Sequence, residues 1–98
     1  MERITKDERR YRAKCRGILM RLAKLSKGRT NQCVPFAELG VKFQDYHCLD
    51  LRDKGLVHLG VDNDGHCGIL LNRAYQGLSM QELAEVMNLV IGKLYDDR

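Results

Sequence analysis

Six side chains of the types that ligate transition metals lie in the middle of the chain. They are Cys33, His47, Cys48, His58, His66 and Cys67. Their spacing is not that of a metal centre, because no two cysteines are separated by two residues as in zinc sites. Each of the two adjacent His-Cys pairs points its side chains in different directions on a helix or a strand. We therefore expect no metal and no other cofactor, with core cysteines and surface histidines.

Patterns typical of catalysis are also missing from the sequence. His47 and Cys48 cannot face one another within a helical turn, and no paired carboxylates, phosphate loop or nucleophile elbow is present. The run DNDG, residues 62–65, has the acids of a calcium loop, but its glycine comes too early and no glutamate follows at the right distance. A tight turn explains this run better. The sequence does not predict an enzyme.

Positive charge is concentrated near the N-terminal end. Residues 1–29 hold eleven Lys or Arg against three acids, a balance of +8, whereas the remaining residues balance to −4. This split predicts a basic surface for nucleic acid or another polyanion. The alternative is a long helix with an ordinary solvated face. Five side chains are the candidates for phosphate contacts: Arg9, Arg10, Arg12, Arg16 and Arg21.

The spacing of the apolar residues predicts three helices in the first half of the chain. A helical repeat and the glycine at position 28 predict a long basic helix over residues 1–28. The run "VPFAELG" opens with a proline suited to a first helical turn and ends at Gly40, which predicts a short second helix. The run "VKFQDYHCLDLRDKG" is long enough for roughly three or four turns and ends at Gly55, which predicts a third.

A hairpin and a last helix complete the predicted elements. After Gly55 the apolar period changes to two, and "LVHLGV" and "HCGILL" flank the turn sequence, which predicts a β-hairpin. Ser79 and Glu82 have the spacing of a capping box, which predicts the start of a helix over residues 79–96. Its apolar residues recur at the spacing of a helix that pairs with another helix. This seam consists of Met80, Leu83, Met87, Val90 and Leu94.

Together these elements resemble the winged helix-turn-helix superfamily. The phrase "LRDKGLVHL" carries most of the likeness: Leu51 has the inward position late in the reader helix, Gly55 ends that helix, and Leu56 and Val57 enter the wing. The last helix is similar to the one that pairs subunits in PadR-type and replication-terminator-type proteins. The resemblance implies a single mainly α domain of the α+β class in the order α-α-α-β-β-α, with the helix-turn-helix and wing over residues 34–72.

The resemblance also implies a function. A protein of this kind would be a small dimeric transcriptional regulator, of bacterial, phage or plasmid type, that binds specific sequences of double-stranded DNA. Its third helix would lie in the major groove, where Gln44 and Arg52 would read base edges. Tyr46 would contact phosphate or a thymine methyl. The remaining contacts would come from Lys42, Lys54 and, in the wing tip, His66.

Three aspartates in the third predicted helix conflict with that function. Asp45, Asp50 and Asp53 would repel phosphates, and the wing tip adds acids instead of Lys or Arg. The basic first helix offers one answer, because it can supply the phosphate affinity that the reader helix and wing lack. The alternative is that the aspartates only balance neighbouring cations, and that the domain is a protein–protein interaction module with little DNA binding.

The expected partners and location follow from the same features. We expect a homodimer joined through the last helix, although its seam could instead pack on the first helix of the same chain. The segment "MERITKDERR" lacks the apolar core of a signal peptide, and no apolar run is long enough to cross a bilayer. The sequence therefore predicts a cytoplasmic protein without a membrane partner.

Overall fold

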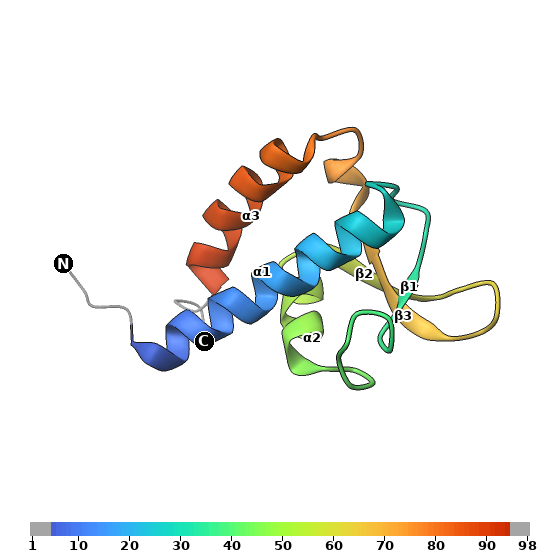
Figure 1. The fold of residues 1–98 in the computed structure, drawn as a ribbon, viewed down its shortest axis with the longest axis horizontal. Helices are drawn as coiled ribbons and strands as arrows, with labels where there is room; N and C mark the ends of the chain where they lie inside the picture. Colours follow the sequence, from blue (N-terminus) through green and yellow to red (C-terminus); the bar gives the residue numbers. More distant parts are fainter. Residues whose placement is uncertain (1–4, 95–98) are drawn as a thin grey trace.

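The chain folds in the order α-β-α-β-β-α, and the computed structural model describes residues 5–94 (Figure 1). Helix α1 packs on both α2 and α3 and also covers the sheet. No helix in the described range is long and apolar enough to cross a membrane. The elements are α1 (Lys6–Ser26), β1 (Val34–Pro35), α2 (Tyr46–Asp53), β2 (Val57–Val61), β3 (Cys67–Leu71), the 3-10 turn η1 (Arg73–Tyr75) and α3 (Met80–Leu94).

The long first helix, predicted over residues 1–28, is confirmed over Lys6–Ser26, and both of its ends are capped; positions 1–4 of the prediction lie outside the described residues. The Thr5 hydroxyl accepts a hydrogen bond from the Glu8 N–H at 3.1 Å, which satisfies one of the free donors of the first turn. At the other end Lys27 and Gly28 adopt left-handed conformations, with φ of 55° and 75°. The Gly28 N–H then donates to the Ala23 carbonyl at 2.9 Å, so the helix ends at Ser26.

The predicted second helix is wrong, because its first residues form a strand. Val34 pairs with Ile69 and Pro35 with Gly68, so β1 adds an antiparallel strand to the hairpin, in the order β1-β3-β2. Proline disfavours helical backbone at the residue before it, so Pro35 biases Val34 toward an extended conformation. Gly68 permits the pairing, because a Cβ there would clash with the backbone of Val34 and Pro35. Residues 36–40 then form turns.

The predicted third helix is confirmed only in its second half. Gln44 has a φ of 53°, which is incompatible with a continuing helix, and α2 begins after the cap residue Asp45. The helix has 8 residues instead of the predicted three or four turns. Its end is as expected: Gly55 has a φ of 77°, and the Leu56 N–H donates to the Leu51 carbonyl at 2.9 Å.

These findings correct the predicted fold class. The predicted winged helix-turn-helix, in the order α-α-α-β-β-α, is wrong for this chain, because the described residues form an α+β fold with a three-stranded antiparallel sheet. A helix-turn-helix requires two helices joined by a short turn, and here a strand and an irregular segment precede α2.

The hairpin and the start of the last helix are confirmed. Strands β2 and β3 pair antiparallel from Val57 opposite Leu71 to Val61 opposite Cys67. Ser79 caps α3 in the predicted manner, since its hydroxyl accepts from the Glu82 N–H at 3.1 Å. The Glu82 carboxylate accepts in return from the Ser79 N–H at 3.2 Å.

One hydrophobic core joins all of these layers. The buried face of α1 contributes the largest share of it, and the sheet, α2 and the first turns of α3 close around that face. Removing these side chains from water supplies most of the driving force for folding. The core residues with the lowest exposure include Cys15, Leu19, Leu22, Val34, Cys48, Leu51, Leu56, Val57, Ile69, Leu71 and Leu83.

Candidate nucleic-acid interface

Two of the three aspartates around α2 are used to build the fold. Asp45 is the N-cap of the helix, and its carboxylate accepts from the His47 N–H at 2.9 Å and contacts His47 Nδ1 at 2.8 Å. Asp50 accepts a hydrogen bond from the Tyr11 hydroxyl of α1. Asp53 alone is largely exposed, at 61%, and lies 3.0 Å from the Arg52 guanidinium. Two of the three carboxylates therefore have hydrogen-bond partners within the fold, and the third lies beside a cation.

Aromatic rings line the contact between α1 and α2. Tyr46 stacks on His47 with ring centroids 3.9 Å apart, and the Tyr11 ring lies 5.4 Å from that of His47. Tyr46 is 54% exposed, so part of its ring faces solvent. A surface groove of about 430 Å³ runs over this stack, and Arg10 and Lys14 lie at its edge with Asp7. The groove combines a π-face with cations, which is a combination that nucleic acids recognise.

The cations of α1 form two rows on opposite sides of its buried face. Arg10, Lys14 and Arg21 are spaced by four and seven residues and share one side of the helix. Arg10 and Lys14 line the groove beside α2, and Arg21 Nε donates to the Glu38 carbonyl at 2.8 Å. We call these three residues the α2-side row. It borders α2 and the segment that precedes α2.

The second row lies toward α3. Arg9 and Arg16 are seven residues apart, and the same step leads to Ala23, which lines a groove with Leu78 and Met80. Neither arginine forms an ion pair with another residue in the range 5–94, and the same holds for Arg10 and Lys14. These four side chains therefore project charge into solvent.

Arg12 differs from the other predicted phosphate ligands. Its guanidinium lies 2.7 Å from the Glu8 carboxylate one turn earlier, and the two side chains are only 22% and 11% exposed. This partly buried pair belongs to the packing of α1. We therefore do not count Arg12 among the groups that are available to a polyanion.

The predicted reader residues do not share one helix. Lys42 and Gln44 are exposed but precede α2, whereas Tyr46 lies in its first turn and Arg52 near its end. Lys54 is the residue that follows the helix. The structure therefore separates the two residues predicted to read bases, Gln44 and Arg52, and brings Tyr46 together with Arg10 and Lys14 instead.

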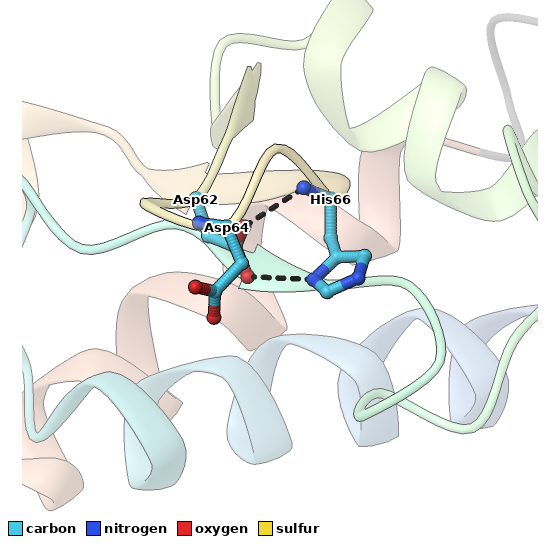
Figure 2. A group of neighbouring side chains, drawn as sticks. All are labelled: Asp62, Asp64 and His66. Carbon is cyan, nitrogen blue, oxygen red and sulfur yellow. Dashed lines mark hydrogen bonds and ion pairs between the residues drawn. The ribbon is translucent and has the colours of Figure 1, made fainter.

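The hairpin tip is organised by Asp62 (Figure 2). One carboxylate oxygen accepts from the Asp64 N–H at 2.9 Å and from the His66 N–H at 2.8 Å, and the other lies 3.4 Å from His66 Nδ1. These hydrogen bonds, led by the one from the His66 backbone, lower the pKa of Asp62. Ligand atoms of the three side chains lie within 4.8 Å of one another. Because Asp62 already accepts the amide hydrogens of the turn, the cluster is explained by the hairpin.

The cysteines and histidines follow their predictions only in part. Cys15 and Cys48 are buried as expected, and burial, followed by the nearby Asp45, raises the pKa of Cys48 to about 12. Cys67 is exposed, which corrects the prediction of core cysteines. The reason is that β3 extends beyond the core at its first residue. His47 is buried at 9% exposure, which corrects the prediction of a surface histidine.

The predicted dimer seam on α3 is engaged within the chain at one position. Leu83 is 3% exposed and belongs to the hydrophobic core. Met80 is 44% exposed. Leu89, on another side of the helix, is 71% exposed. The side chains of Met87, Val90 and Leu94 lie outside the described part of the structure.

Two residues of the candidate interface were not singled out from the sequence. Lys14 was missed, although its spacing of four from Arg10 is the signal that would have found it. Tyr11 was not singled out either, and its hydroxyl donates to Asp50, which is 39 residues away in sequence. No local pattern reveals that contact.

Comparisons with known proteins found no match: no family model, no curated protein and no solved structure matches this chain.

Proposed function

We propose that the protein binds double-stranded DNA as a small transcriptional regulator, with the α2-side row as its phosphate-binding surface. The observation that carries this proposal is the contrast in charge at the α1–α2 contact. Asp45 and Asp50 accept hydrogen bonds from other residues of the fold, while Arg10 and Lys14 beside them project into solvent. Phosphate attraction supplies most of the affinity of DNA-binding proteins, so solvent-exposed cations next to acids that accept hydrogen bonds within the fold favour that ligand.

The proposed roles differ among the residues of this surface. Arg10 and Lys14 contact backbone phosphates. Tyr46, the first residue of α2, lines the same groove, and its exposed ring and hydroxyl can meet sugar, phosphate or a thymine methyl. Arg52 is the candidate for base reading. Its pairing with Asp53 is exposed, and an exposed pair of this kind is worth little, so the guanidinium can exchange it for a guanine edge.

The test compares two variants of equal charge. The first changes the α2-side row (Arg10→Gln, Lys14→Gln, Arg21→Gln), and the matched control changes Arg9→Gln, Arg16→Gln and Lys27→Gln. Duplex affinity is measured by fluorescence anisotropy at two salt concentrations. We expect the first variant to bind at least about tenfold more weakly and with a flatter salt slope, because fewer counterions are released. Equal losses in both variants would remove the α2-side row as a specific surface, and unchanged binding would refute the proposal.

Sequence preference is tested separately with Arg52→Ala. We expect this variant to retain most of its affinity for random duplex but to lose discrimination of about 1–3 kcal/mol at one base pair of a selected site. An unchanged preference would exclude Arg52 as the reading residue.

A protein–protein interaction module is the second candidate, and exposed apolar side chains favour it. Phe43 is 65% exposed with its ring edge-on to Phe36, and Val61 on the hairpin is 59% exposed. Exposed apolar groups of this size are common at interfaces. A parent protein that binds no duplex at low salt, and a Phe43→Ser, Val61→Ser variant that loses a partner isolated with the parent, would select this function over DNA binding.

We also propose a homodimer that uses the side of α3 that carries Leu89. Leu83 is occupied by the core, whereas Leu89 is 71% exposed and can pack on a second copy. Light scattering at tens of micromolar is the measurement, on the parent and on Leu89→Glu. A dimeric parent and a folded monomeric variant would locate the interface, whereas a monomeric parent would exclude the dimer.

A further inference from the structure

A polar cavity lies between the turn that follows α1 and the short helix η1. Its volume is about 510 Å³, within the range of pockets that hold small molecules. The described residues that line it are two arginines, two side-chain amides and one hydroxyl, and they include no acid. They are Arg29, Thr30, Asn31, Arg73 and Gln76.

The two walls of this cavity are held by hydrogen bonds. On the α1 side, the Arg29 N–H donates to the Ser26 carbonyl at 3.0 Å, directly after the capped end of the helix. On the η1 side, the Asn72 side chain accepts from the Ala74 N–H at 3.0 Å, and its amide donates to the Gly55 carbonyl. These contacts fix the backbone on which the lining side chains are carried.

One side-chain contact joins the two walls. The Thr30 hydroxyl donates to Gln76 Oε1 at 3.3 Å, across 46 residues of sequence. With its oxygen accepting this bond, Gln76 keeps its amide hydrogens as donors. The segments at residues 29–31 and 73–76 therefore form one site, although nothing in the sequence links them.

The chemistry of the lining selects an anion. Neither Arg29 nor Arg73 forms an ion pair with another residue between positions 5 and 94. Guanidinium groups bind phosphate in bidentate geometry, and the amide and hydroxyl groups add neutral donors around it. Lys24 and Lys27 nearby on α1 raise the local positive potential further and offset the partial negative charge at that helix end.

We infer that this cavity binds the phosphate group of a small phosphorylated molecule. The proposal is independent of DNA binding. Lys14, which lines the groove beside α2, and Arg29 are separated by on the order of 20 Å along the direction of α1, and Arg21, the nearest member of the α2-side row, lies on the order of 10 Å from Arg29, from the rise per residue of a helix. A concave site at the C-terminal end of α1 also suits a compact ligand better than a duplex backbone that follows the outer surface.

The test is a titration with inorganic phosphate, followed by ¹H–¹⁵N correlation spectra. Sodium chloride at matched ionic strength is the reference. We expect saturable shifts confined to the amides of residues 29–31 and 73–76. Arg29→Gln and Arg73→Gln should each weaken phosphate binding at least about tenfold, whereas the matched control Arg16→Gln should retain the parent's affinity. Shifts equal to those caused by chloride, or parent-like binding by both cavity variants, would overturn the proposal.

A second arm separates a small ligand from the phosphates of DNA. The phosphate titration is repeated with the protein saturated by duplex DNA, or with excess duplex added if no binding is detected. Unchanged phosphate binding supports the small-ligand site, whether or not the protein binds DNA. Displacement of phosphate by duplex, together with weaker duplex binding by Arg29→Gln and Arg73→Gln, would assign the cavity to a nucleic-acid interface and overturn the small-ligand proposal. Thermal melting of each variant confirms that it is folded.

Discussion

Helix α1 and the segment from β1 to α2 lie side by side but are determined in different ways. The first is a 21-residue helix with local caps at both ends, and its cations Arg9, Arg10, Lys14 and Arg16 form no ion pair with another residue in the range 5–94. The second changes conformation several times within 20 residues, and its acids bind neighbouring groups. A charged residue counted in the sequence is therefore not necessarily available to a ligand, because its neighbours in space decide whether it is already bound within the fold.

The largest loss of stability is expected from disturbing the sheet contact that keeps residues 34–35 extended. Gly68→Ala places a Cβ against the backbone of Val34 and Pro35. We expect a loss of about 3 kcal/mol in the free energy of unfolding, at the upper end of overpacking effects, measured by urea denaturation. Gly17→Ala is the control, since an added Cβ there meets nothing within 4 Å. A neutral Gly68→Ala would show that local preference alone holds β1.

Tyr11→Phe tests the hydrogen bond that links Asp50 to α1. The variant keeps the buried ring and removes the hydroxyl that donates to the Asp50 carboxylate. A hydrogen bond to a charged group contributes about 1.5–3 kcal/mol, so we expect a loss of that size in urea denaturation. If stability is unchanged, the hydrogen bond from the Tyr11 hydroxyl does not contribute to holding α2 against α1.

Asp45→Ala tests the use of the second aspartate as a helix cap. It removes the acceptor of the His47 N–H and the contact to the His47 ring. We expect a loss of about 1 kcal/mol in the free energy of unfolding, the usual effect of deleting an N-cap. Asp45→Asn should recover most of it, because an asparagine oxygen still caps the helix. Equal losses in both variants would instead implicate the carboxylate charge.

The hairpin tip offers a pH-dependent test of whether the Asp62 carboxylate, too, is bound within the fold. The pKa of Asp62 is below its ordinary value of 3.8, so the stabilisation by its carboxylate is complete above that pH. It is lost as the pH falls through the lowered pKa, because protonation removes the charged acceptor. We expect the amide signals of Asp64 and His66 to titrate together in this acidic window. Signals that are constant in parent and Asp62→Asn alike would exclude the carboxylate as their acceptor.

The smallest effect is expected on α1 itself. Arg9→Gln with Arg16→Gln removes two charges that form no ion pair with any other residue between 5 and 94. We expect the free energy of unfolding to change by less than about 0.5 kcal/mol, as for most surface substitutions. Urea denaturation of this variant and of Tyr11→Phe under the same conditions compares the two losses of stability directly. A large loss in the arginine variant would mean that these cations serve the fold, and it would disqualify Arg9 and Arg16 as neutral controls for the α2-side row.

The sequence by itself determined the elements whose signals are local. Helix periodicity located α1, the alternating apolar runs located the hairpin, and the spacing of Ser79 and Glu82 located the start of α3. In each case the deciding groups lie within a few residues of one another, so propensity and capping agree with the final structure. The basic character of α1 was also visible, because composition alone carries it.

Only the tertiary structure decided β1, the use of the aspartates and the phosphate cavity. Val34 and Pro35 become a strand because β3, more than thirty residues later, presents Gly68 at close approach. Asp50 accepts a hydrogen bond from α1, and Arg29 and Arg73 line the same cavity. Contacts between distant segments have no period and no fixed spacing in the sequence. They arise when the elements pack around the core, because the buried apolar faces then set which polar groups become neighbours.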